Sequence, residues 1–83
     1  MKLVLIEWED SLGCSTKWQT LELSGKPKPL ICQSVGWLLY DGKDCKVVVP
    51  HITKDHASAA RQGCGDMTIP TKCITKIKVL AVQ

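Results

Sequence analysis

The chain has 83 residues and a mass of 9.2 kDa, which suits one domain and excludes a second folded unit. Hydrophobic residues make up 45% of it and charged residues 23%, with no low-complexity tract, so residues 1–83 are expected to fold rather than stay disordered. The net charge of +3 is mild. It permits a nucleic-acid partner without arguing for one, because dedicated binders concentrate far more basic charge.

The amino terminus predicts a strand rather than a targeting signal. Its apolar run, Leu3–Ile6, stops at the acidic stretch Glu7–Asp10, well short of a signal-peptide core. No other window approaches the length of a membrane span. We therefore expect a strand over Lys2–Trp8, a loop over Glu9–Cys14, a cytoplasmic protein and no membrane partner.

A β-hairpin is predicted at the centre of the chain. Branched and aromatic residues fill Leu30–Tyr40 and Cys45–Val49, and Asp41–Asp44 between them contains Asp-Gly. This dipeptide is typical of primed turns, which need a positive φ that glycine reaches without steric cost. Gly36 inside the first strand predicts a bulge or a sharp bend, and hence a sheet that curls into a small barrel.

The remaining elements complete an all-β pattern. Apolar spacing over Thr16–Leu23 fits both a helix and a strand, and we expect a short helical turn or an irregular cover over one barrel mouth. Pro27 and Pro29 predict an extended backbone over 24–29, because each proline fixes its own φ and keeps the residue before it out of the helical region. Pro50 should end the second hairpin strand, and the last strand should have one solvated face. Five short strands predict a mainly β, single five-stranded SH3-like or Sm-like barrel with at most one or two short helical turns. The two later strands are expected at Asp66–Ile69, closed by Pro70, and at Cys73–Leu80.

The segment between the hairpin and the fourth strand is the candidate binding region. Asp55 is placed to cap a helix over 56–62 with Gly63 past its end, and an uncapped loop is the alternative. Polar and basic side chains on irregular backbone beside a rigid sheet are typical of recognition, although a solvated loop has the same composition. The candidate ligand-binding residues here are His51, Lys54, His56, Arg61, Gln62 and Gly65, with Asp55 among them in sequence.

Aromatic side chains are the second candidate feature. Trp37 and Tyr40 are candidate ligand-binding residues because an exposed ring can stack on a base, and Trp8 and Trp18 are further candidates. The alternative for each ring is core packing, which a small chain without phenylalanine favours.

The cysteines and the missing motifs argue against catalysis. The five cysteines contain no C-x-x-C pair and are expected to be reduced, buried hydrophobes, with zinc binding alongside His51 or His56 as the alternative. Cys64 with His51 or His56 resembles a nucleophile and base but lacks an orienting third group. No hydrolase, P-loop or zincin motif is present. We therefore expect no enzyme and no cofactor.

Several motifs resemble small barrel proteins encoded by tailed bacteriophages. They are W-E-D, S-V-G-W-L-L-Y-D-G-K-D with V-V-V-P-H-I, and G-D-M-T-I-P followed by I-T-K-I-K-V-L, and they span nearly the whole chain. The chain is similar, more loosely, to the Sm and Hfq RNA-binding rings. Gly36, Leu38 and Asp41 fit the first Sm motif, but Lys46 and Val47 stand where its asparagine is expected, and Ile69-Pro70-Thr71 departs from the second motif. The resemblance implies a barrel in the cytoplasm of a host bacterium.

Together these observations predict a non-enzymatic, homo-oligomeric phage-type protein that sequesters a nucleotide or another phosphate-bearing ligand. In its sharpest form the hypothesis is an anti-defence sponge for a host immune signal. A pocket between subunits is expected, because a small barrel has little interior space and assembly would cover strand edges. The alternatives are an Sm/Hfq-like protein that binds single-stranded RNA or DNA, and an adaptor that inhibits a host protein through a strand edge.

Overall fold

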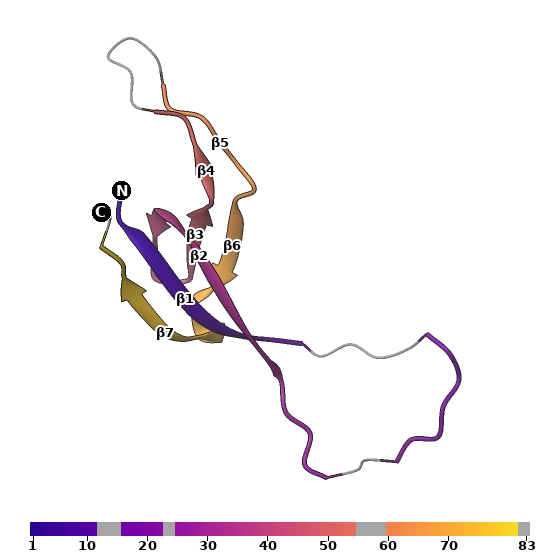
Figure 1. Cartoon of the computed structure of the whole chain (residues 1–83). Coiled ribbons are helices and arrows are strands. Elements are labelled where there is room, and N and C mark those ends of the chain that lie inside the picture. The colour runs from indigo at the N-terminus through magenta and orange to yellow at the C-terminus, as the bar shows by residue number, and fades with distance from the viewer. Residues whose placement is uncertain (12–15, 23–24, 55–59, 82–83) are drawn as a thin grey trace.

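In the part of the chain that the structure describes, seven strands form a five-stranded antiparallel sheet and a separate two-stranded ribbon (Figure 1). The computed structural model describes residues 1–11, 16–22, 25–54 and 60–81. All five predicted strands are present in the sheet, and the fold is mainly β as expected. The sheet consists of β1 (Leu3–Asp10), β2 (Leu30–Asp41), β3 (Cys45–Val49), β6 (Met67–Pro70) and β7 (Ile74–Val79). The ribbon consists of β4 (His51–Ile52) and β5 (Gly63–Cys64), and a short 3-10 turn, η1, spans Thr71–Cys73.

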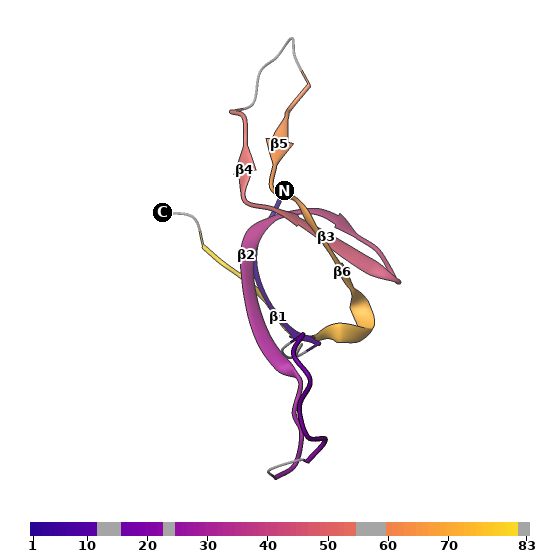
Figure 2. The same cartoon turned by 90° about the vertical axis from the view of Figure 1, so that its right-hand side faces the viewer.

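The sheet is curved but open. Its strand order is β6-β3-β2-β1-β7, so the last strand lies beside the first. Figure 2 shows β2 bowed along its length and the sheet bent around one face. Within the described residues β6 and β7 remain at opposite edges and do not pair, so a closed barrel is not shown. The one helical element among these residues, η1, is much too short to cross a membrane.

The core lies on the concave face of this sheet. Residues directly opposite each other on neighbouring strands share a face, which places Val4 and Ile6 of β1 together with Gly36 and Ser34 of β2. Val4 and Ile6 have no exposed surface, and they cluster with Val48 and Ile69. The indole Nε1 of Trp8, packed against this cluster, donates to Ser34 Oγ at 3.0 Å. Trp8 is therefore a core residue, as the packing alternative predicted.

The predicted central hairpin is confirmed, but two of its details are wrong. Gly42 does not have a positive φ; the strands are joined by 42–44, and the glycine makes room for the Tyr40 ring, which a Cβ would overlap. The register shift lies between Leu38 and Tyr40 rather than at Gly36. Gly36 instead allows close approach of β3, because a Cβ there would lie 3.0 Å from the Val49 carbonyl oxygen.

The last strand also differs from its prediction. Alternation over Ile77, Lys78 and Val79 predicted one buried and one solvated face, but Ile77 is 42% and Val79 59% exposed. Both residues lie on the core face, opposite Ile6 and Val4. They stay exposed because β7 is an edge strand, and no other strand among the described residues lies beside its outer edge.

The connection from β1 to β2, residues 11–29, forms what we call the arm. The expectation that Thr16–Leu23 covers a barrel mouth is wrong for the described part: residues 16–22 contain no helix and extend away from the sheet (Figure 1). Trp18 is 103% and Leu21 94% exposed, because neither reaches the core. The arm and the ribbon give the chain extents of 59 × 26 × 25 Å and a radius of gyration of 17.1 Å, against about 12 Å for a compact chain of this length.

The cysteines in the described ranges match their prediction only in part. Cys32, Cys45 and Cys73 are half-buried and unpaired, whereas Cys64 is exposed on the ribbon. Cys14 lies outside the described residues.

Candidate functional site

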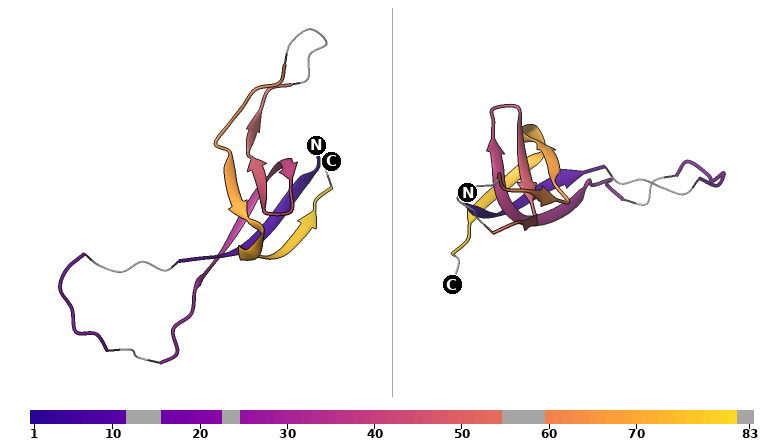
Figure 3. Two further views of the ribbon diagram at one scale, coloured as in Figure 1. Left: turned by 180° about the vertical axis from the view of Figure 1, so that it is seen from behind. Right: turned by 90° about the horizontal axis from the view of Figure 1, so that it is seen from above.

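The ribbon leaves the sheet where β3 ends. Pro50 interrupts the ladder after Val49, as predicted, and the chain then enters β4. On the return, Gly65 follows β5 with a φ of 77° and leads into β6. A Cβ at Gly65 would lie 3.1 Å from Pro50 Cγ, so the two residues form a tight base. Figure 3 shows the ribbon rising from the end of the sheet opposite the arm, with the amino terminus near its base.

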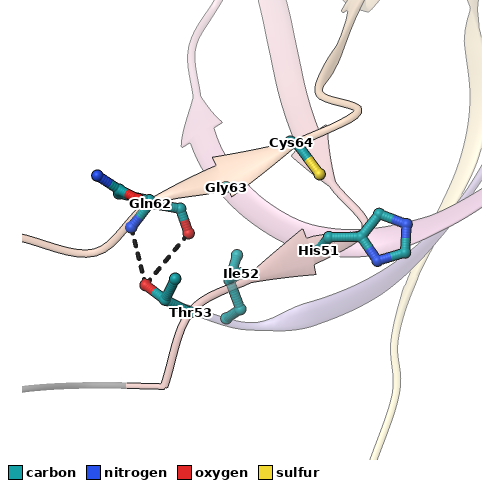
Figure 4. A pocket seen from close by; sticks show the side chains of 6 residues that line it. All are labelled: His51, Ile52, Thr53, Gln62, Gly63 and Cys64. Atoms are coloured by element: carbon teal, nitrogen blue, oxygen red, sulfur yellow. Dashed lines mark hydrogen bonds between the residues drawn. The ribbon is translucent and has the colours of Figure 1, made fainter.

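Cross-strand bonds hold the ribbon together. His51 pairs with Cys64 and Ile52 with Gly63. Beyond these pairs Thr53 N donates to Gln62 O at 2.8 Å. Gln62 N donates to Thr53 Oγ1 at 2.9 Å, and Thr53 Oγ1 donates to Gln62 O at 3.4 Å (Figure 4). This region was predicted as a helix over 56–62 or a loop. The helix is wrong at 60–62, which carry no helix, and at Gly63, which belongs to β5; Asp55, His56 and the rest of 55–59 lie outside the described residues.

Gly63 allows the ribbon to pack closely against the sheet. A Cβ at this position would come within 2.9 Å of both the His51 carbonyl oxygen and Val49 Cγ2. Any larger residue would push β5 away from β3. Val49 is 3% exposed, so the base of the ribbon is in van der Waals contact with the sheet rather than free in solvent.

Two hollows flank the ribbon. The first, about 300 Å³, is formed by β4, β5 and the adjoining residues Thr53 and Gln62. It is shallow and contains the His51–Cys64 pair and the Thr53–Gln62 bonds (Figure 4). The second, about 240 Å³, lies between the ribbon and the sheet and is more enclosed. We regard the second, the ribbon–sheet pocket, as the better candidate site, because ligand sites are concave and mostly apolar with a few polar groups.

The ribbon–sheet pocket combines an apolar floor with a polar rim. The floor comes from four separate elements, namely the amino terminus, the β2 bulge, β3 and β4, and the rim comes from β5 and its flanks. Arg61 and Asp66 both line this pocket, so it carries one basic and one acidic side chain. The lining residues are Met1, Leu39, Val49, Ile52, Arg61, Gln62, Gly63 and Asp66.

The structure brings several predicted site residues together. Arg61 and Gln62 line the ribbon–sheet pocket, and His51 lines the shallow hollow on the ribbon. Lys54 is exposed just beyond Thr53, and Gly65 forms the base. His56 lies outside the described residues.

The two aromatic candidates separate. Trp37 is half-buried and pairs with Val49, which places it beside the pocket floor. Tyr40 is 56% exposed and lies over Gly42 in the hairpin turn, at the other end of β3. The register Tyr40↔Val47 and Trp37↔Val49 therefore leaves Tyr40 outside the candidate site.

Sequence reasoning named only two of the eight residues that line the pocket, Arg61 and Gln62. Met1, Leu39 and Asp66 line it, and none of them was singled out as a binding residue. Leu39 reaches it because the register shift falls between Leu38 and Tyr40. Glycine at position 63, followed by Cys64-Gly65, was the one available signal of close backbone approach.

The described residues contain no group of three or more His, Cys, Asp and Glu side chains placed to hold a metal ion. A third hollow of about 330 Å³ lies at the opposite end of β3, lined by Lys43, Asp44, Pro70, Thr71 and Lys72. Comparison with protein-family models, curated proteins and solved structures finds no match for this chain.

Proposed function

We propose that the chain is a non-enzymatic binding protein whose ribbon–sheet pocket holds part of a phosphate-bearing ligand of the nucleotide type. The observation that carries the proposal is that apolar side chains line one pocket together with Arg61, Gln62 and Asp66. Guanidinium binds phosphate oxygens through parallel N–H bonds, and a carboxylate accepts from amino or hydroxyl groups. A nucleotide carries anionic phosphate on its sugar and amino or N–H donors on its flat base.

The size of the pocket limits what it encloses. Sites for drug-sized ligands usually measure roughly 300–1,000 Å³, and this one measures about 240 Å³. It therefore holds one base or one phosphate group, with the rest of the ligand lying along the exposed ribbon near His51 and Lys54. A second copy of the chain would enclose the ligand further, which agrees with the expectation of a homo-oligomer.

The test is calorimetry with a panel of cyclic, linear and ADP-ribose-derived nucleotides at fixed ionic strength. We expect one member to bind, and Arg61→Gln to weaken it at least about tenfold, because hydrogen bonds to charged groups contribute roughly 1.5–3 kcal/mol. Asp66→Asn should alter the preference among bases more than the affinity for phosphate. Lys72→Gln is the matched control, since it removes one positive charge from the opposite end of β3.

If Arg61→Gln and Lys72→Gln lower the affinity for the nucleotide equally, the interaction is general electrostatic attraction. That result would contradict binding in the ribbon–sheet pocket. Absence of heat with every nucleotide would contradict the ligand class. The finer hypothesis, a sponge for a host immune nucleotide, rests on the phage resemblance and is tested by the cyclic and ADP-ribose-derived members of the panel.

We further infer that the sheet is an open relative of the SH3-like or Sm-like barrel. The strand order supports this inference, because four strands follow one another as neighbours and the fifth returns to the first. A single-stranded nucleic-acid function has less support, since Trp37 and Tyr40 lie apart and Trp8 is in the core.

A further inference from the structure

The outer edge of β7 carries unpaired backbone groups, and the pairing with β1 shows which residues they belong to. Leu80 N donates to Leu3 O at 2.8 Å, which makes Leu3 and Leu80 a hydrogen-bonded pair. In an antiparallel ladder this state alternates, so Lys78 and Lys76 also turn their backbone groups toward β1. The N–H and C=O groups of Ile77 and Val79 therefore point away from the sheet, where no described strand receives them.

The side chains of β7 divide by face. Ile77 and Val79 lie on the core face and remain 42% and 59% exposed. Lys76 and Lys78 lie on the outer face, where Lys76 stands opposite Glu7 but Lys78 stands opposite Leu5. A strand added to this edge would be favoured if it carried an apolar residue on one face and an acid on the other.

The arm contains such a sequence. Trp18 and Leu21 are the most exposed large hydrophobic side chains in the described chain. Leu21 is followed by the exposed Glu22. In the free arm Glu22 N donates to Thr20 O, and this tight turn opens when the segment becomes a strand, in which neighbouring residues point to opposite faces. The same chain therefore exposes two complementary features. The β7 edge combines apolar side chains with Lys78, and the arm combines apolar side chains with Glu22.

We propose that residues Trp18–Glu22 of one copy add as a strand to the β7 edge of a second copy. Leu21 then covers Ile77 and Val79, and Glu22 lies beside Lys78. The arrangement is reciprocal, so two arms and two edges are used in one dimer. It also covers an edge strand that otherwise invites uncontrolled pairing.

A second copy is the occupant because of where the arm points. Its two ends are fixed together by the Asp10↔Leu30 pair at the end of the β1–β2 ladder. From there the arm extends to the side away from β7 in each view (Figures 1 and 3). Its apolar residues are thus offered to another molecule rather than to the edge of their own sheet.

The test is a charge exchange, read by light scattering over a range of protein concentrations. Glu22→Lys alone sets lysine against Lys78, and Lys78→Glu alone sets glutamate against Glu22. We expect each variant to dimerise about tenfold more weakly than the wild type. An equimolar mixture should recover the dimer, because both of its interfaces then pair opposite charges. Lys72→Glu and Glu9→Lys are matched controls, since they make the same charge changes off the β7 edge and off the arm.

Hydrogen exchange supplies the second measurement. The amides of Ile77 and Val79 should become protected as protein concentration rises, and Leu21→Ala should remove that protection. The proposal is overturned if these amides exchange freely in a dimer, or if the chain stays monomeric at every concentration. Protection that is independent of concentration, with no recovery on mixing, would show that the arm folds onto its own sheet and would equally overturn it.

Discussion

The arm and the ribbon region are both long connections between hydrogen-bonded neighbours of one sheet. The ribbon region packs against the sheet, whereas the described part of the arm extends away from it. The arm joins β1 to β2, and the ribbon region joins β3 to β6. In the ribbon region, strand pairs and the Thr53–Gln62 bonds hold the two sides together, and Gly63 sits against Val49. In the described part of the arm, Glu22 N donates to Thr20 O, which ties the arm to itself and not to the sheet.

The difference follows from local chemistry. Gly63 and Gly65 let the ribbon backbone approach the sheet and turn sharply at its base. The arm instead returns through Gly25-Lys26-Pro27-Lys28-Pro29, in which two prolines lack the N–H that a ladder requires. A connection becomes a positioned site when its backbone can bond across itself and rest on a buried side chain. Without those contacts it remains a presented segment.

The largest expected effect comes from removing the core beneath both regions. Ile6→Ala should destabilise the fold by about 2–5 kcal/mol, because Ile6 is fully buried and a cavity would remain. A domain of this size has roughly 4–12 kcal/mol of total stability. Urea unfolding measures the change, and Ile6→Val gives a graded version at about 0.5–1.5 kcal/mol if the alanine variant does not fold. Val35→Ala, at an exposed position, is the control; an equal loss there would contradict the proposed core.

A smaller effect on stability is expected at two glycines, one in the ribbon region and one in the arm, that both have a positive φ. Gly65 at the ribbon base and Gly25 in the arm have φ values of 77° and 90°. Gly65→Ala should cost about 1–2 kcal/mol, since the left-handed strain adds to a 3.1 Å approach to Pro50 Cγ. Gly25→Ala should cost less than about 1 kcal/mol, because nothing lies within 4 Å and the arm can relax. Thermal unfolding of the pair measures both changes, and equal losses would mean that the arm is as firmly held as the ribbon.

The sheet was predictable because its signals are local. Branched residues bounded by acidic residues, Asp-Gly and proline located all five sheet strands to within a few residues. The turn type was wrong because Asp-Gly is typical of two-residue loops, whereas 42–44 join the strands here. The bulge was misplaced because Gly36 has another role, the close approach of Val49, that also requires glycine.

The candidate site was predictable only as a region. Arg61 and Gln62 were named because recognition residues are commonly found on irregular backbone beside a rigid sheet, although a solvated loop has the same composition. The floor of the pocket could not be foreseen, since Met1, Leu39 and Val49 meet there through long-range pairing and a register shift. The same limit explains Trp18: burial is the statistical expectation for tryptophan, and only the path of the arm places it in solvent.

The smallest expected effect is at Trp18. Trp18→Ala should change the free energy of unfolding by no more than about 0.5 kcal/mol in dilute solution, because the ring is 103% exposed and buries nothing in one copy. Trp8→Ala is the matched control. That indole packs against the core and donates to Ser34 Oγ, so its loss should cost about 3–5 kcal/mol. Chemical unfolding of both variants at several protein concentrations measures the difference. A loss at Trp18 that grows with concentration would reflect mass action on an assembled form, and a large loss that does not vary with concentration would place the arm against its own sheet.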